Sequence, residues 1–394
     1  MDLGFLYGFL NLSFWEYVLV TVIMVQVTVM AVTLYLHRDA AHRSLELHPA
    51  LRHFFRFWIW VSSAMLTREW VAVHRKHHSF SDVPGDPHSP VVFGIRKVLW
   101  QGAELYAEEI CKPETLEKYG RGTPDDWVER NVYSRYKNLG IVLMVITDLL
   151  LFGVPGIIII AVQMISMPLL AAGVINGLGH HSGYRNFECE DAARNIVPWG
   201  ILVGGEELHN NHHAFPASAK FSARSWEFDI GWFYIRILES LGLAKVHRVA
   251  PEPARVTPRR TVDLENLRAV IVNRMHVLRD YSRKVTLPVL RAESARDAGV
   301  AYLKRGVRKL LVRHPRLLDE QAARRLKEVL ASNPALRTVH EFRERLLQLW
   351  SGAHASNERL VAQLREWCAQ AEASGIKALQ DFALSLRGYA MQPA

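Results

Sequence analysis

Half of the 18 histidines in this 394-residue chain fall into four short clusters. The clusters read HRDAAH, HRKHH, NGLGH and HNNHH, and their members are His37 and His42; His74, His77 and His78; His180; and His209, His212 and His213. Positions i, i+3 and i+4 share one face of a helix, so each H-x-x-H-H copy can direct three imidazoles toward one point. Because two such copies are very unlikely by chance, the pattern predicts a metal centre.

The number and type of ligands narrow the choice of metal. A structural zinc takes four ligands, usually including cysteine, whereas the three cysteines here lie far apart and form no C-x-x-C pair. Nine imidazoles therefore favour two ions of higher coordination, from among iron, zinc, copper and nickel. Two metals in a histidine cage indicate redox or hydrolytic chemistry.

Carboxylates near these histidines in the sequence are candidates for a supporting role. An imidazole that binds a metal needs an acceptor for its second ring N–H. The candidates are Asp39, Asp82, Asp86, Asp191, Glu206 and Glu207. Solvated surface carboxylates are an equally good interpretation of each one.

The clusters alternate with apolar segments that predict a membrane protein. Residues 18–36 carry no formal charge and, at ~1.5 Å per residue, are long enough to cross a ~30 Å hydrocarbon core. Residues 1–17 contain no Lys or Arg, which favours a retained anchor over a cleaved signal peptide. Residues 51–66 are interrupted by charge and are too short to span, so we expect an interfacial or re-entrant helix there.

Residues 139–179 form a third apolar stretch, broken at Gly153-Val154-Pro155-Gly156. This break predicts a transmembrane hairpin, since proline removes a backbone donor and glycine permits a reversal. Asp148 and Gln163 lie within the stretch, and we expect them to face the protein interior and to hydrogen-bond between helices. With a hairpin here and one crossing before it, all four clusters lie on one membrane side.

The charge divides the chain into two parts. Residues 245–394 carry a net +13 and residues 1–244 carry −4, although the whole chain is only +9. The predicted fold is an all-α integral membrane protein. Its membrane domain, residues 1–244, carries the di-metal site on transmembrane helices and an interfacial helix, and residues 245–394 form a basic, soluble helical extension. Basic residues beside the clusters place the site in the cytoplasm, and the membrane is taken to be a bacterial inner membrane.

The same motifs resemble those of the membrane fatty acid desaturases, in particular the Δ9 acyl-chain branch. The resemblance covers residues 15–245 and rests on HRDAAH, EWVAVHRKHHSFSDVPGDPHSP, NGLGHHSGYRNFECEDAARN and GEELHNNHHAFPASAKF, in this order. It implies two iron ions that use O₂ and two electrons to introduce a cis double bond into a saturated acyl chain. That chain would be carried on coenzyme A or on a phospholipid of the membrane.

The resemblance also implies a ligand set. One iron would take His37, His42, His78 and His213, with Asn176 reaching it through water. The other would take His74, His77, His180, His209 and His212. His88 and His181 lie next to these motifs but are not part of the implied set.

The sequence also bears on the electron donor, on nucleic-acid binding and on two alternative functions. No haem or dinucleotide-binding motif is present, so the electrons would come from a separate carrier, such as a ferredoxin or cytochrome, with its NAD(P)H reductase. Nucleic acid is not expected as a partner, because basic charge without a recognition motif is weak evidence.

A di-iron hydroxylase of an alkyl chain or sterol is the alternative enzyme. A metal transporter is the alternative from another class, although it would place its ligands at midmembrane depth.

Overall fold

The computed structural model describes residues 4–296, 306–351 and 356–391, and the chain folds into two compact units. The first unit comprises Met1–Arg185 and Ala192–Ala250, and the second comprises Asn186–Asp191 and Pro251–Ala394. The main division therefore falls six residues after the expected boundary at 244/245. The inclusion of Asn186–Asp191 in the second unit has no counterpart in the sequence-based prediction.

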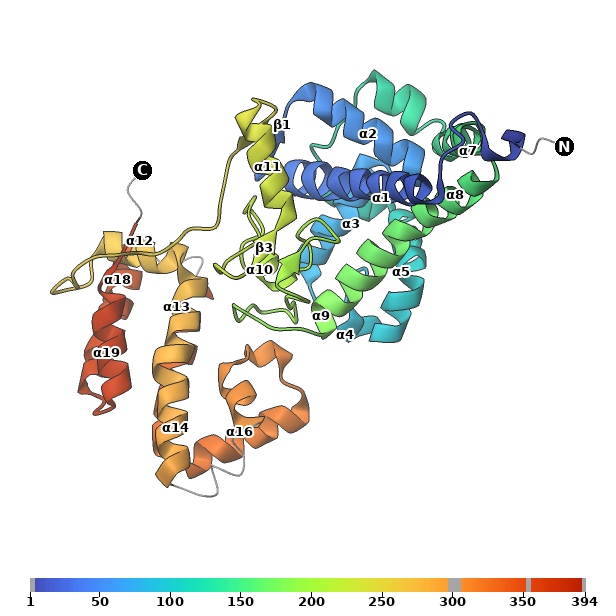
Figure 1. Ribbon diagram of the computed structural model, residues 1–394. Coiled ribbons are helices and arrows are strands. Elements are labelled where there is room, and N and C mark those ends of the chain that lie inside the picture. The colour runs from blue at the N-terminus through green and yellow to red at the C-terminus, as the bar shows by residue number, and fades with distance from the viewer. Residues whose placement is uncertain (1–3, 297–305, 352–355, 392–394) are drawn as a thin grey trace. The chain divides into compact units, whose positions relative to one another are not determined.

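The first unit is mostly helical (Figure 1). Its elements, with η for 3₁₀- or π-helical segments, are η1 (Gly4–Tyr7), α1 (Phe14–Met30), η2 (Ala31–Ala41), β1 (Leu45–Leu47), α2 (Pro49–Ser63), α3 (Thr67–Phe80), α4 (Pro90–Phe93), α5 (Ile95–Ile110), α6 (Pro113–Tyr119), η3 (Glu129–Tyr133), α7 (Leu139–Phe152), α8 (Val154–Met167), η4 (Pro168–Leu178), α9 (Gly179–His181), β2 (Trp199–Gly200), α10 (His209–Ala214), β3 (Phe228–Asp229), α11 (Ile230–Ser240) and β4 (Ala244–Val246). Short β1 pairs antiparallel with β4, and β2 pairs parallel with β3.

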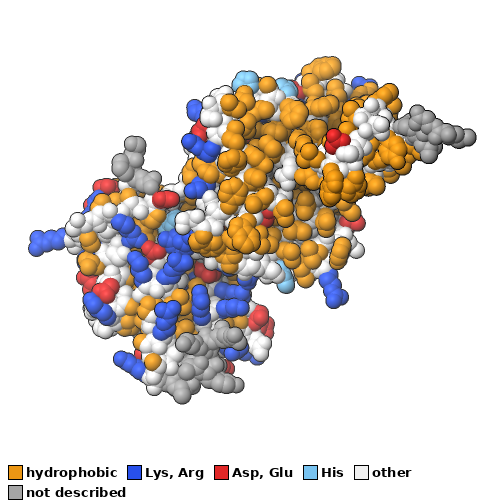
Figure 2. Space-filling model, in the orientation of Figure 1, with side chains coloured by type: hydrophobic (Ala, Val, Ile, Leu, Met, Phe, Trp, Pro, Cys, Tyr) orange, Lys and Arg blue, Asp and Glu red, His pale blue; other side chains and the backbone are white. Residues whose placement is uncertain are grey.

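In the part of the chain that the structure describes, two continuous helices are long and apolar enough to cross a membrane. They are Phe14–Ala41, formed by α1 and η2, and Val154–His181, formed by α8, η4 and α9. The shorter apolar helix α7 precedes the second, and Gly153 joins them with a φ of 62° that a side chain would disfavour. The predicted hairpin and its break are therefore present. Figure 2 shows that apolar side chains cover much of this part of the surface.

The polar pair inside the hairpin lies as predicted. The Gln163 Nε2 atom donates to Asp148 Oδ2 at 2.8 Å, and both side chains are buried. This bond joins α8 to α7 and satisfies two groups that lipid could not solvate. The amphipathic helix predicted within residues 51–66 is α2, which packs against α7 and η2.

The second unit is a helical domain with its own core. Its elements are β5 (Ala254–Arg255), α12 (Leu264–Val272), α13 (Arg274–Tyr281), η5 (Ser282–Thr286), α14 (Leu287–Arg296), η6 (Pro315–Leu317), α16 (Glu320–Ser332), α17 (Pro334–Ser351), α18 (Asn357–Ala373), α19 (Lys377–Leu386) and β6 (Tyr389–Ala390). Tyr281, Trp367 and Phe382 form the aromatic centre of this core. The amphipathic patterns predicted a helical extension, and the continuous core makes it a folded domain.

Candidate metal centre

The histidines of the first cluster converge because the first long helix widens at its end. Segment η2 is π-helical, and the His42 N–H donates to the His37 carbonyl at 3.0 Å, an i to i+5 bond. The wider turn brings residues five apart onto one face, and the two ring centroids lie 5.0 Å apart. The sequence requires such a departure from ideal α-helix, and the structure supplies it.

The other clusters lie on α3, at the end of the second long helix and on the short helix α10. His74, His77 and His78 project from α3, His180 from α9, and His209, His212 and His213 from α10. All nine predicted histidines come together in two groups, within each of which the candidate ligand atoms lie no more than 4.8 Å apart. The first group is His37, His42, His74, His78 and His212, and the second is His77, His180, His209 and His213.

This grouping differs from the division that the resemblance implies. His213 lies in the second group instead of the first, whereas His74 and His212 lie in the first group instead of the second. The structure therefore brings the expected nine histidines together, but it groups them differently from the implied division between two ions. His88, left out of the implied set, forms a third group with His77 and Asp86, and its ring stacks on His77 at 4.5 Å.

The ring nitrogens face one another across the interior of the groups. The Nε2 atom of His212 lies 3.0 Å from that of His37 and 2.9 Å from that of His78. The Nε2 atoms of His180 and His209 are likewise 3.0 Å apart. Only one proton can bridge each pair of nitrogens, so several buried lone pairs point into the same small volume. A cation bound by nitrogen ligands fits this donor set.

Three carboxylates prepare the imidazoles for that role by accepting their other ring proton. His37 Nδ1 lies 2.7 Å from Glu206 Oε1, and His180 Nδ1 lies 2.7 Å from Asp82 Oδ2. His77 Nδ1 lies 3.0 Å from both oxygens of Asp86. A proton held on Nδ1 leaves the Nε2 lone pair free to bind a metal.

The remaining predicted carboxylates lie elsewhere. Asp39 makes a bidentate pair with Arg52, at 2.6 and 2.7 Å, instead of contacting an imidazole. Glu207 accepts the backbone N–H groups of Val203 and Gly205 and so closes a turn. Asp191 belongs to the second compact unit.

Burial keeps several of these histidines neutral, which is the form that binds metal. Burial lowers the pKa values of His74, His78, His209 and His212 well below their usual range. Burial opposes ionisation of Asp82, but the adjacent His180 and several hydrogen bonds outweigh it and lower the pKa of Asp82 to about 2. Asp82 is therefore an anion that faces the centre.

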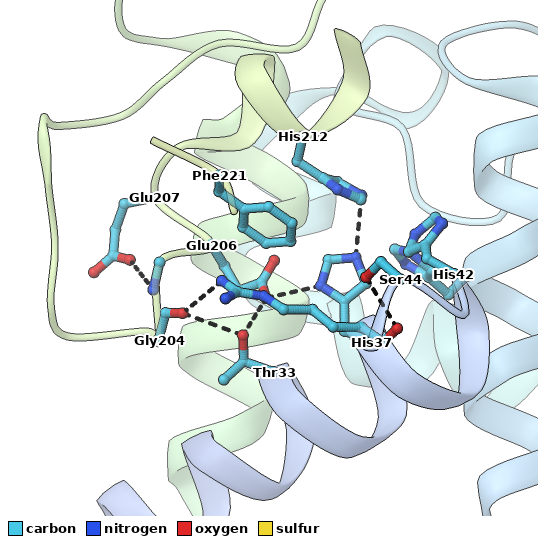
Figure 3. A network of polar contacts seen from close by, with 12 residues as sticks. Thr33, His37, His42, Ser44, Gly204, Glu206, Glu207, His212 and Phe221 are labelled. Carbon is cyan, nitrogen blue, oxygen red and sulfur yellow. Dashed lines mark hydrogen bonds and ion pairs between the residues drawn. The ribbon is translucent and has the colours of Figure 1, made fainter. Parts of the chain in front are cut away.

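Glu206 is held by a network that sequence reasoning did not find (Figure 3). The Thr33 hydroxyl donates to Glu206 Oε1 at 2.6 Å, and Arg38 donates to the Gly204 carbonyl at 3.2 Å. Both Gly204 and Gly205 have positive φ, so this turn needs glycine to bring Glu206 to His37. Burial raises the pKa of Glu206 to about 8.

An apolar cavity opens beside the first group of histidines. It has a volume of about 250 Å³, and its wall includes Val32, Met65, Ala171, His74 and Asn176. A smaller cavity of about 50 Å³ shares part of this wall and reaches His37 and Glu206. Trp70, which stacks on His74 at 4.9 Å, lines both cavities and was not predicted. Asn176, expected near an ion, therefore lies on the cavity wall beside His74.

Comparison with known proteins agrees with this centre and its apolar cavity. The sequence model described as Fatty acid desaturase matches residues 13–227. The chain belongs to the fatty acid desaturase family. It is therefore an oxidoreductase that acts on acyl chains, and its membrane helices and histidine groups fit that family.

Several characterised relatives carry related names. The chain is 31% identical over 246 residues to Delta-9 acyl-lipid desaturase 1 of Arabidopsis thaliana, a match that covers 61% of this chain and 78% of the relative. It is 32% identical to the sn-1 stearoyl-lipid 9-desaturase of Synechocystis, covering 57% and 69% of the two chains. It is also 31% identical to the Acyl-CoA 5-desaturase AL21 of Anemone leveillei, covering 57% and 69%.

The second unit has a separate match. A sequence model described as Transposase matches residues 266–392, which is about a third of the chain. Among the described residues of this unit, no group of three His, Cys, Asp or Glu side chains is arranged to hold a metal ion. The match indicates sequence similarity to that family over this unit.

Proposed function

We propose that this chain introduces a cis double bond at the Δ9 position of a saturated acyl chain carried on a membrane lipid. The acyl-lipid and Δ9 assignments come from the names of the relatives from Arabidopsis and Synechocystis. The observation that carries the proposal is the position of nine converging imidazoles beside an apolar cavity. A coenzyme A thioester is the alternative substrate, in keeping with the name of the Anemone relative.

The proposed cofactor is a pair of iron ions with O₂ as co-substrate. Imidazole and carboxylate-supported sites suit iron, and such a centre supplies the oxidising power to remove hydrogen from an unactivated alkyl carbon. The first ion would be held by the five histidines of the first group, and the second by the four of the second group. Asn176 is proposed to reach the centre through water.

The protein's own contribution is positioning. The cavity wall formed by Val32, Met65, Ala171 and Trp70 offers apolar contacts to methylene groups and excludes water. His74 forms part of the same wall, so a chain in the cavity lies directly against the first group. Asp82 and Asp86 keep the ring protons of His180 and His77 on Nδ1, and so hold each imidazole in one orientation.

We propose that the centre faces the cytoplasm of a bacterial cell and is reduced by a separate ferredoxin or cytochrome with its NAD(P)H reductase. Arg and Lys residues next to the clusters support this orientation by the positive-inside rule. We also propose that nucleic acid is not a partner. A duplex-DNA binding assay at physiological salt tests this last point, and tight, sequence-dependent binding would contradict it.

The direct test is expression in a host that lacks desaturases, followed by mapping of double bonds in lipid fatty acids. We expect Δ9 unsaturated chains from the wild-type protein and none from His212→Ala or His180→Ala. His181→Ala is the matched control, because His181 is exposed and its Nδ1 contacts Ser182. Hydroxylated products would instead identify a hydroxylase, and full activity of His212→Ala would refute the metal centre.

A further inference from the structure

Six residues of the loop after His180 belong to the C-terminal unit and not to the unit that carries the histidines. The segment Asn186–Asp191 groups with Pro251–Ala394, although the residues before and after it group with the first unit. The sequence between α9 and α10 contains almost no regular structure, and such loops are usually mobile. Interactions that hold this segment therefore restrict a loop that begins at a proposed metal ligand.

Aromatic and charged contacts hold the segment within the C-terminal unit. Phe187 is only 1% exposed, and its ring lies edge-on to that of His276 with centroids 5.3 Å apart. The Arg279 guanidinium lies 5.8 Å from the Phe187 ring centroid, and both partners project from α13. Arg316 donates to Glu190 at 3.0 Å. Phe187 is thus the buried anchor, and the Glu190 pair is an exposed addition.

Ala192, the residue that follows the segment, is hydrogen-bonded to Asp82, the carboxylate that accepts the ring proton of His180. The Ala192 N–H donates to Asp82 Oδ2 at 2.7 Å, and the same oxygen accepts His180 Nδ1 at 2.7 Å. Two residues further on, the Arg194 N–H donates to the Gly179 carbonyl at 2.6 Å. The loop therefore returns to the helix that carries His180 as soon as it leaves the C-terminal unit.

We propose that the C-terminal unit positions His180 for metal binding by anchoring Phe187, and so fixes the Ala192 N–H that holds Asp82. The inference rests on the proposed metal centre and assigns a role to the 144 residues Pro251–Ala394, which the family match to residues 13–227 does not include. Phe187 acts here as a positioning residue. It acts through the backbone that follows it.

The test uses full-length protein loaded with Co²⁺, from which an excess of chelator then removes the metal while its absorbance is followed. Changes to groups that orient metal ligands typically weaken binding about 10- to 100-fold. We expect Phe187→Ala to accelerate release of one of the two ions about tenfold, with the other unchanged. Phe342→Ala is the matched control, since Phe342 is a buried phenylalanine of the same core that packs on Trp367. It should leave both release rates unchanged.

A second pair of variants keeps the proposal testable if Phe187→Ala does not fold. Reversing the charge of Glu190 with Glu190→Arg should accelerate release of the same ion about twofold, because an exposed pair contributes at most ~1 kcal/mol. Adding Arg316→Glu should restore the wild-type rate. Wild-type release from Phe187→Ala, or from Glu190→Arg where the first variant does not fold, would overturn the proposal.

His180→Ala separates failure of this inference from failure of the proposed function. If His180 is a ligand, this variant should hold one Co²⁺ ion fewer than the wild type. Retention of both ions by His180→Ala would refute the metal assignment itself. Loss of an ion from His180→Ala, together with wild-type release from Phe187→Ala, would refute only the role of the C-terminal unit.

Discussion

Replacing Asp86 with asparagine tests whether the carboxylates prepare the histidines for metal. Asp86 is 2% exposed and accepts three N–H groups, of which that of His77 Nδ1 is shared between both carboxylate oxygens at 3.0 Å. The others come from the backbone N–H groups of Asp82, at 2.8 Å, and His88, at 3.0 Å. An asparagine keeps the shape but offers an NH₂ group in place of one oxygen. The new NH₂ donor would then face another N–H donor, either the ring N–H of His77 or a backbone N–H.

The expected cost follows from these contacts. A hydrogen bond to a charged group contributes about 1.5–3 kcal/mol, and loss of a carboxylate behind a ligating histidine weakens metal binding about 10- to 100-fold. The latter corresponds to about 1.4–2.7 kcal/mol of binding free energy. Facing an amide NH₂ in place of a second oxygen, His77 can also adopt the tautomer protonated at Nε2, which leaves no Nε2 lone pair for a metal.

The assay for Asp86→Asn is metal content by elemental analysis, combined with chelator competition on purified protein. We expect one of the two metal ions to bind more weakly and the amount of unsaturated product to fall accordingly. Asp125→Asn is the control, because the Asp125 side chain is 78% exposed and lies 4.0 Å from Arg130. Two ions bound with wild-type affinity in Asp86→Asn would refute the reasoning about carboxylate support.

Three further outcomes test the cavity, the packing and the protonation of the site. Ala171→Leu adds bulk where the two cavities share a wall, so we expect a shift to shorter product chains, measured by gas chromatography. An unchanged distribution of product chain lengths would show that the cavity does not hold substrate. Arg56→Met leaves the buried Glu129 carboxylate without its 2.9 Å partner, and thermal unfolding in detergent should report a loss of about 3–5 kcal/mol, whereas a change below 1 kcal/mol would contradict the expected cost. Burial lowers the pKa of His42 to about 3 and that of His212 well below its usual value, whereas an unfolded histidine titrates near about 6.5. Since the unfolded state then binds more protons, stability and metal retention should be full above pH ~6.5 and fall as the pH drops toward ~3; stability that rises on acidification would contradict this sign.

Local spacing was sufficient to find the histidines and the hairpin. His37 and His42 are five apart, so they share one face only if the helix unwinds or tightens there, and the structure has a π-helix. Gly153 breaks an otherwise continuous apolar run, and Asp148 and Gln163 lie close enough across that break to bond. In each case the determining interaction lies within about one helical hairpin, so sequence periodicity carries the information.

Contacts between distant segments were not accessible in the same way. Asp39 lies close to His37 in the sequence, but its carboxylate forms an ion pair with Arg52 of α2. The buried Arg38 instead bonds Asp229, the N-cap of α11 and a residue 191 positions away, at 3.0 Å. Nothing in the local sequence distinguishes these partners, because the packing of α2 against η2 decides the first pair and that of α11 against η2 the second.

The division of the histidines between the two groups follows from helical geometry once the two H-x-x-H-H motifs are treated separately. Residues four apart lie about 40° apart around a helix, whereas neighbours lie about 100° apart. His74 and His78 therefore share one group while His77 faces the other. The motif on α10 does the reverse, giving two histidines to the second group and His212 to the first.

Neighbouring histidines on α3 should therefore belong to different ions, and stoichiometry can test this. The double variant His77→Ala with His180→Ala removes two ligands from the same group, so the protein should still hold one ion. The variant His78→Ala with His180→Ala removes one ligand from each group, so both ions should be weakened. Elemental analysis after dialysis against a weak chelator separates the two results. Equal metal content in the two double variants would show that the ions do not divide the histidines in this way.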